Sequence, residues 1–191
     1  MSNLLIFGPP GAGKGTQADL IAKKYKLTHL SSGEILRAEL KNGELGASIK
    51  KYQDAGKLVP DSLIIKIMDQ AVLKNIKKSG FIFDGYPRTI KQAKAMDSFF
   101  KKNKIALKAV VNLKLGKAEA IKRALSRGKT SGRSDDNIKT LRARLVVYRT
   151  QTAPLLEYYK GQKKVINIDG RPKIEIVFKE ISERLNKKGG Y

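Results

Sequence analysis

The sequence predicts a three-layer α/β fold, in which a parallel five-stranded sheet is covered by helices on both faces. Short, almost entirely apolar runs recur along the 191 residues, as expected of strands buried on both faces. Longer segments with apolar residues at helical spacing lie between these runs, and a glycine-rich turn follows the first run. Strands that alternate with helices favour right-handed crossovers and a parallel sheet, so we expect ligands at the carboxyl ends of the strands.

Each element is predicted from its own pattern. The apolar runs that predict strands are 4–7, 81–83, 109–113 and 165–168, with a weaker run over 27–30. The amphipathic segments that predict helices are 16–25, 34–40, 63–76, 90–100, 117–125, 137–148 and 174–185.

Two stretches interrupt this alternation within what we expect to be a single domain over residues 1–191. Residues 31–60 contain short helical pieces separated by glycines and Pro60, which predicts an inserted helical subdomain. Residues 127–136 predict a polar loop, and we assign a short lid to residues 127–137. We expect both segments to be able to move.

Composition excludes several classes of function. There is no cysteine, which excludes disulfide and thiol chemistry, and no apolar run approaches the ~20 residues that a membrane span needs. The N-terminal residues do not resemble a secretion signal, so we expect a cytoplasmic protein that does not enter a membrane. The formal charge of +23 favours anionic partners. Because the lysines occur in pairs along helices with few aromatic residues among them, we do not expect specific nucleic-acid binding.

A phosphate-binding cradle is predicted directly after the first strand. Residues 8–14, Gly-Pro-Pro-Gly-Ala-Gly-Lys, match G-x-x-x-x-G-K between a strand and a helix, the context that this motif requires. The glycines let backbone N–H groups turn towards phosphate oxygens, and Lys14 adds a mobile cation. The sequence therefore predicts a P-loop fold that binds a nucleoside triphosphate. Gly15 stands where Ser or Thr is usual, with Thr16 one residue later, so we do not expect the loop to ligate Mg²⁺ directly.

A second cluster of polar residues follows the strand over 81–83. Asp84 can hold Mg²⁺ through water beside the cradle, as acids at strand ends do in P-loop enzymes. Arg88 can form paired hydrogen bonds with a phosphate, and Gln92 can contact a base edge through one donor and one acceptor. An acid and a turn before a helix would also fit a purely structural role. With the cradle, however, these residues predict a second phosphorylated ligand.

Together, residues 8–16, 84–92 and 130–137 resemble the adenylate kinase family in its short-lid form. Residues 30–37 resemble the start of the monophosphate-binding insertion of that family, and residues 56–59 resemble its end. The resemblance extends over nearly the whole chain. It implies reversible transfer of a phosphoryl group from ATP to AMP, with Mg²⁺, for adenine nucleotide homeostasis.

The resemblance also implies roles for individual residues. It assigns AMP binding to Ser32, Arg37, Lys57, Leu58, Val59, Gly85, Arg88, Gln92, Arg133 and Arg144. It assigns ATP binding to Gly11, Ala12, Gly13, Lys14, Gly15, Thr16, Arg123, Arg127, Gly170 and Pro172. It implies catalysis by Lys14, Arg88, Arg123, Arg133 and Arg144, and water-mediated Mg²⁺ contact by Asp84.

Several further expectations follow. The nucleophile would be the phosphate of AMP, which is mostly dianionic at neutral pH because its second pKa is about 6, so no catalytic base is needed. Transfer should wait until the insertion and the lid have closed and excluded water. The short lid and the lack of cysteine make a structural zinc unexpected. The family favours a monomer and a cis Tyr86-Pro87 peptide bond.

Two alternatives remain open. A UMP/CMP kinase would share the fold, the cradle and the arginines; Ser32 and Gln92 resemble the adenine-reading pair, although Thr is commoner at the position of Ser32. A nucleotide-switched nucleic-acid-binding protein would account for the net charge.

Overall fold

Five parallel strands form the sheet of the computed structural model, which describes residues 3–42, 46–76, 80–131 and 135–188. The strands are β1 Asn3–Phe7, β2 Thr28–Ser31, β3 Phe81–Asp84, β4 Leu107–Lys114 and β5 Val165–Asp169. Their order across the sheet is β2-β3-β1-β4-β5, with Leu4 of β1 aligned to Ile82 on one side and to Ala109 on the other. The predicted parallel five-stranded sheet is confirmed.

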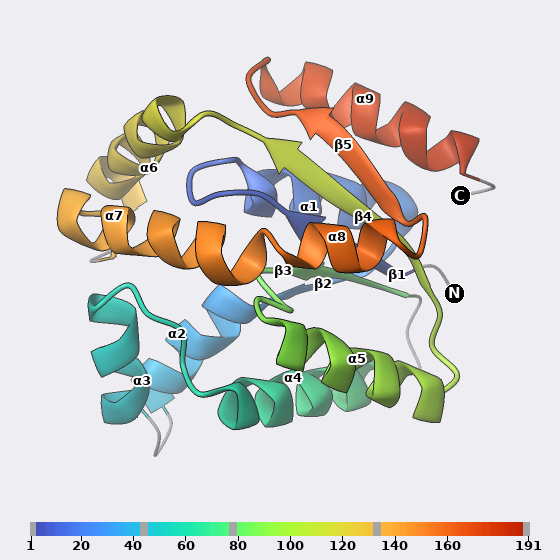
Figure 1. The fold of residues 1–191 in the computed structure, drawn as a ribbon, viewed down its shortest axis with the longest axis horizontal. Helices are drawn as coiled ribbons and strands as arrows, with labels where there is room; N and C mark the ends of the chain where they lie inside the picture. The colour runs from blue at the N-terminus through green and yellow to red at the C-terminus, as the bar shows by residue number, and fades with distance from the viewer. Residues whose placement is uncertain (1–2, 43–45, 77–79, 132–134, 189–191) are drawn as a thin grey trace.

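Helices cover both faces of the sheet (Figure 1). The order of elements in the chain shows them alternating with the strands. The helices are α1 Lys14–Tyr25, α2 Ser32–Asn42, α3 Gly46–Asp54, α4 Asp61–Asn75, α5 Ile90–Lys102, α6 Lys117–Ser131, α7 Ile138–Val147, α8 Leu155–Lys160 and α9 Ile174–Lys187, with a π-helical turn over Tyr148–Thr152.

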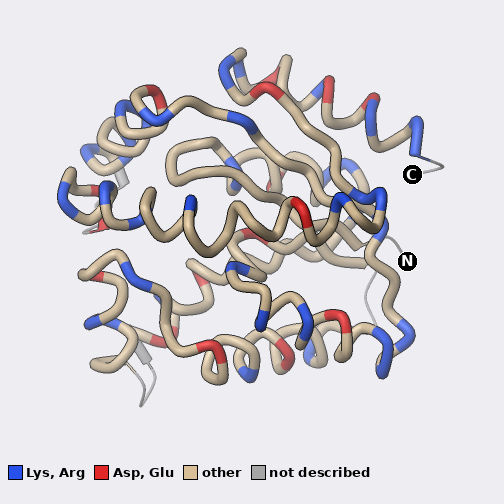
Figure 2. Tube along the Cα trace, in the orientation of Figure 1, with Lys and Arg blue, Asp and Glu red and all other residues tan. Residues whose placement is uncertain are grey.

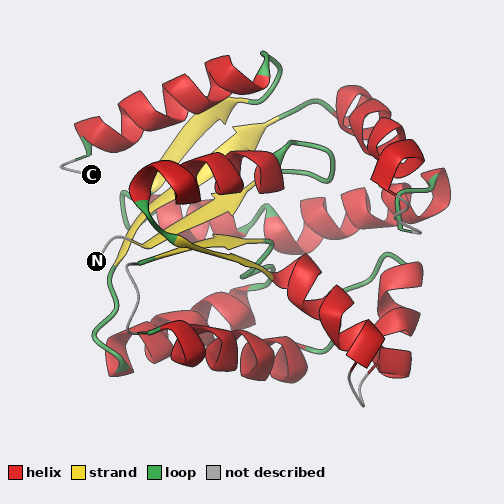
Figure 3. Ribbon diagram, turned by 180° about the vertical axis from the view of Figure 1, so that it is seen from behind, coloured by secondary structure: helices red, strands yellow, loops and turns green. Residues whose placement is uncertain are grey.

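Alternation along each strand divides the core into two layers. Leu4 and Ile6 pack with α1 and α9, whereas Leu5 and Phe7 pack with α4, α5 and α8. All four of these side chains are buried, because successive strand residues point to opposite faces of a sheet that is covered on both. Figure 3, seen from behind, shows α1 lying across the near face of the sheet.

The segment over residues 31–60 contains β2's last residue and the helices α2 and α3, which pack against each other at one end of the molecule (Figure 1). Thr140 of α7 approaches this segment, since its Oγ1 donates to the carbonyl of Asp54 over 3.1 Å. That the segment moves as a unit stays a prediction.

The prediction of a polar loop over residues 127–136 is wrong for its first part. Helix α6 continues through Ser131, and a turn follows at Asp135. Arg127 and Gly128 are therefore helical. The helix ends later than its apolar pattern indicated, because polar residues can continue a helix whose apolar residues lie in its earlier turns. Gly132, Arg133 and Ser134 lie outside the described residues. Helix α8, which follows the π-helical turn, was not predicted.

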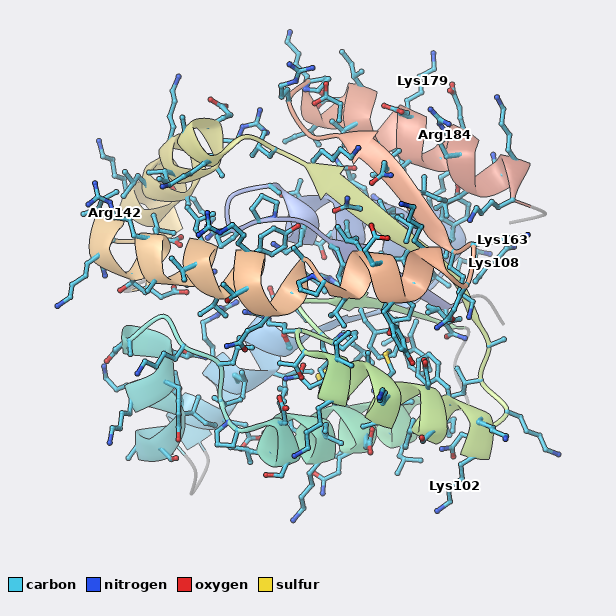
Figure 4. The ribbon with its side chains drawn as sticks, in the orientation of Figure 1. Lys102, Lys108, Arg142, Lys163, Lys179 and Arg184 are labelled. Carbon is cyan, nitrogen blue, oxygen red and sulfur yellow. The ribbon has the colours of Figure 1, made fainter. Side chains whose placement is uncertain are left out.

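Lysine and arginine residues are spread along the helices and loops of the Cα trace (Figure 2). Lys102, Arg142 and Lys179, on three different helices, are exposed and extend away from the ribbon (Figure 4). This arrangement agrees with the interpretation of the lysine-rich helices as solvated faces.

Among the residues that the structure describes, no helix has the length and apolar character needed to cross a membrane.

Candidate active site

The glycine-rich cradle lies between β1 and α1, at the carboxyl edge of the sheet. The backbone N–H of Ala12 donates to the carbonyl of Pro9 over 3.1 Å, and Gly13 precedes the helix with a φ of 82°. Gly11 has a φ of +85°, and a Cβ there would lie 2.1 Å from the carbonyl oxygen of Ala120 on α6. Glycine at position 11 therefore lets the cradle pack closely against the start of α6.

Lys14 is the first residue of α1 and turns back over the cradle. Its ammonium donates to the carbonyl of Pro9 over 3.0 Å. Burial lowers the pKa of Lys14 to about 8; Asp84 opposes this shift, whereas Arg88 and Arg144 reinforce it. A bound polyphosphate would relieve this crowding of positive charge, which is the electrostatic property of an anion site.

A second positive centre, the guanidinium of Arg88, is held in place by the carbonyl of Gly85, just after β3. This oxygen accepts a hydrogen bond from Ser32 Oγ and one from Arg88 Nε, each over 2.6 Å. The backbone of Arg88 is also held, since Thr152 Oγ1 donates to its carbonyl over 3.1 Å. Burial and then Arg144 lower the pKa of Arg88 to about 10, whereas Asp84 and Asp135 oppose this shift. The predicted cis peptide bond at Tyr86-Pro87 is confirmed.

Both centres open into one cavity. Five basic side chains and one acidic side chain line it, which leaves a strong excess of positive charge. The cavity brings together the cradle lysine and all but one of the residues expected at the monophosphate site. These lining residues are Lys14, Ser32, Arg37, Lys57, Leu58, Val59, Gly85, Arg88, Gln92 and Arg144. The exception, Arg133, lies outside the described residues.

Arg127 of α6 and Arg144 of α7 contact carboxylates in this structure. Arg127 forms two hydrogen bonds with Asp136, over 2.7 and 2.8 Å, and Arg144 contacts Asp135 over 2.7 Å. Arg144 also reaches Asp136 over 3.2 Å, and the Asp136 side chain has no exposed surface. The two aspartates therefore hold and orient the guanidinium groups of Arg127 and Arg144, and Arg144 lines the cavity.

Arg123 links α6 to the segment that follows β5. Its guanidinium donates to the carbonyls of Gly170 and Arg171, each over 2.7 Å, and to Glu119 over 2.7 Å. A Cβ at Gly170 would lie 3.8 Å from the carbonyl oxygen of Ala12. The cradle, Arg123 and Gly170 are therefore neighbours, and Pro172 follows Gly170 by two residues.

Asp84 meets the requirements for a magnesium contact. It ends β3 beside the cradle, where its Oδ2 would lie 3.5 Å from a Cβ at Gly15 and lies 4.0 Å from His29 Nε2. Within the described parts of the chain, no group of three or more His, Cys, Asp or Glu side chains is placed to hold a metal ion. A single carboxylate suits Mg²⁺, which is commonly held by one or two carboxylates, phosphate oxygens and water.

Asp135 and Asp136 lie within residues 130–137, which carry the family resemblance, but no role was predicted for them, and none was predicted for Asp61. The pair follows Arg133 after one intervening serine, but nothing local indicated that the aspartates fold back onto Arg127 and Arg144. Asp61 resembled an acid at a helix start, which usually needs no further explanation.

We expect Gly128→Ala to destabilise the protein and slow turnover. A Cβ at Gly128 would lie 2.9 Å from the Cβ of Asp136, so it would push that residue away from Arg127. Helix propensity alone would stabilise the variant by about 1 kcal/mol. Overpacking costs ~1–3 kcal/mol, so a net loss of up to ~2 kcal/mol is expected in denaturant unfolding.

Gly116→Ala provides the control, because a Cβ at Gly116 has nothing within 4 Å. If Gly128→Ala gained stability and kept its turnover, the close contact between α6 and Asp136 would not matter for the lid.

The fold and the site define a P-loop phosphotransferase with room for a second anionic ligand opposite its cradle. A family model described as adenylate kinase matches residues 6–164. The chain belongs to the adenylate kinase family.

Similarity to curated relatives extends over nearly the whole length. The chain is 48% identical over 187 residues to an adenylate kinase of Parabacteroides distasonis, covering 97% of this chain and 98% of that protein. It is 44% identical over 189 residues to an adenylate kinase of Bacteroides thetaiotaomicron, covering 98% and 100%. It is 46% identical over 176 residues to an adenylate kinase of Leptospira biflexa, covering 92% and 95%.

Proposed function

We propose that this chain catalyses the reversible reaction ATP + AMP = 2 ADP in adenine nucleotide homeostasis. The observation that carries the proposal is the single cavity in which five cations face one acid, with the cradle lysine and Arg88 in the same lining. A cavity so positive needs anionic occupants, and its two centres match two phosphorylated ligands held end to end. The name shared by the curated relatives supports the choice of substrates.

The triphosphate would occupy the cradle. Backbone N–H groups of residues 11–16 would surround its phosphates, Lys14 would contact the outer phosphates, and Arg123 and Arg127 would add charge from α6. The neighbourhood of Arg123, Gly170 and Ala12 supports placing the adenine of ATP near Gly170 and Pro172. Arg127 would have to exchange part of its pairing with Asp136 for a phosphate contact.

The monophosphate would occupy the opposite centre. Arg37 and Arg88 would hold its phosphate, and Ser32, Lys57, Leu58, Val59, Gly85 and Gln92 would surround the rest of the nucleotide. Arg144, and by the family resemblance Arg133, would bridge the two ligands. We propose the roles of the described residues because they line the same cavity.

Catalysis then depends on position and charge. The acceptor phosphate is already anionic, so the residues need only align donor and acceptor, neutralise the equatorial oxygens and exclude water. Mg²⁺, when bound with ATP, would neutralise charge between the outer phosphates, and Asp84 would hold it through water. The chain's own contribution is the array of Lys14, Arg88 and Arg144 around the line of transfer.

The test is ADP formation from ATP plus AMP, with and without Mg²⁺, followed by the reverse reaction from ADP. We expect magnesium-dependent activity in both directions, because one site must accept both pairs of nucleotides. CMP, UMP and GMP serve as competing acceptors, and turnover fastest with CMP or UMP would identify a pyrimidine kinase instead. Tight polynucleotide binding at ordinary salt without ADP formation would favour the nucleic-acid-binding alternative.

A further inference from the structure

Asp61 connects the start of α4 to the start of α5 through hydrogen bonds, next to the centre proposed for the monophosphate. It is the first residue of α4, and it does not belong to the lining of the cavity as the described residues define it. Its Oδ1 accepts from Gln92 Nε2 over 2.7 Å, and Thr89 Oγ1 donates to its carboxylate over 3.2 Å. Thr89 in turn caps α5 by accepting from the backbone N–H of Gln92 over 3.1 Å.

These contacts fix the orientation of the Gln92 carboxamide, that is, the positions of its oxygen and its NH₂ group. An ionised carboxylate can only accept hydrogen bonds, so the group facing Asp61 must be the NH₂. The backbone N–H of Arg88 can only donate, and it donates to Gln92 Oε1 over 2.7 Å. A reversed amide would set oxygen against carboxylate and NH₂ against N–H. Gln92 is only 2% exposed, so little water is at hand to compensate for either clash.

The part of the Gln92 amide that the protein does not use is available to a ligand in the cavity. A carboxamide has two N–H groups and two acceptor sites on its oxygen, and the protein uses at least one of each. Gln92 also lines the cavity, so a remaining N–H and acceptor site form a pair whose order is fixed. Adenine offers an amino donor beside a ring acceptor. Hypoxanthine has the same shape but offers an oxygen acceptor beside a ring N–H donor.

We infer that Asp61 is a positioning residue that fixes the donor and acceptor order of Gln92 and so selects adenine over 6-oxopurine bases. The inference rests on the proposed AMP site. Asp61 acts without touching the nucleotide. Without it, only the N–H of Arg88 opposes reversal of the amide, and the site loses part of its preference for AMP over IMP.

The experiment compares kcat/KM for AMP and IMP in four proteins: wild type, Asp61→Ser, Asp61→Asn and Asp69→Ser. Serine suits a helix start but is too short to reach Gln92, whereas asparagine keeps an acceptor oxygen at the same distance. Asp69 lies two turns along the same helix and outside the lining of the cavity, so its replacement is the matched control.

We expect the AMP-to-IMP ratio to fall roughly tenfold in Asp61→Ser, equivalent to ~1.4 kcal/mol. The KM for AMP should rise and the KM for ATP should not change. Asp61→Asn should keep most of the ratio, and Asp69→Ser all of it. A structural role for Asp61 would instead lower all rates together.

A ratio within twofold of wild type in Asp61→Ser would overturn the inference, and so would equal losses in the serine and asparagine variants. Side-chain NMR of the wild type provides a test that needs no variant. One N–H of Gln92 should resist solvent exchange without nucleotide, and the other only with AMP; free exchange of both in the free protein would also overturn the inference. Failure of the proposed function would be seen separately, as a wild type that does not phosphorylate AMP.

Discussion

Replacing Lys14 with methionine is expected to lower turnover by ~10²–10³-fold, the usual cost of removing one preorganised charge from a transition state. Lys14 is the cation nearest the cradle, and its ammonium already points at the Pro9 carbonyl. Methionine keeps the length and apolar stem of the side chain but removes the charge. The measurement is steady-state ADP formation from ATP and AMP.

The same change should raise the free energy of unfolding. Burial lowers the pKa of Lys14 from 10.5 to about 8, so the charged form is less favourable in the folded protein than in the unfolded chain. This cost is fully present below pH 8 and disappears as the pH rises through 10.5, where the lysine is neutral in both states. We expect Lys14→Met to gain on the order of 1–3 kcal/mol at pH 7 and to lose this advantage by pH 10.5.

Denaturant unfolding at the two pH values, without nucleotide, measures the difference. A variant that is equally inactive but less stable at pH 7 would show that Lys14 is structural. Lys14→Arg is the control, since it keeps the charge and should keep the destabilisation.

Replacing Gly11 with alanine is expected to destabilise the protein by ~2–5 kcal/mol, the sum of the costs of a left-handed backbone and a severe overlap. Its φ is +85°, and the added Cβ would lie 2.1 Å from the Ala120 carbonyl oxygen. That oxygen belongs to the backbone of α6, so it cannot rotate away. The cradle and α6 would have to separate, and triphosphate binding should weaken with them.

Gly13→Ala is the matched control. Its φ of +82° is nearly the same, but a Cβ there has nothing within 4 Å. It should therefore lose only ~1–2 kcal/mol, the cost of the left-handed backbone alone. Thermal and denaturant unfolding without nucleotide separate the two; equal losses would show that contact with α6 does not restrict the cradle.

Local pattern was enough to predict the sheet and the cradle. The alternation of Leu4 and Ile6 with Leu5 and Phe7 was hidden in a continuous apolar run, and such a run is typical of a strand buried on both faces. The cradle could be predicted because its glycines are needed for the backbone conformation of the loop, and because its position between strand and helix is visible in the sequence. The four arginines beyond β4 were found only through the family resemblance.

The end of α6 and the network beneath the monophosphate centre could not be predicted in the same way. The polar composition of residues 127–131 suggested a loop, whereas they form the last turns of a helix whose apolar residues lie earlier. Asp61 and Gln92 are 31 residues apart, and their hydrogen bond exists only because α4 and α5 start side by side. No local signal marks such a pair.

The sequence by itself therefore determined the class of fold, the phosphate cradle and the types of residue available to each ligand, because these depend on neighbours in the chain. Tertiary structure alone decided which cations share a cavity, which aspartates hold Arg127 and Arg144, and which way the Gln92 amide faces. The physical reason is that charge pairing and hydrogen-bond order depend on distances of a few ångströms between segments that are far apart in the chain, and packing of the two core layers sets those distances.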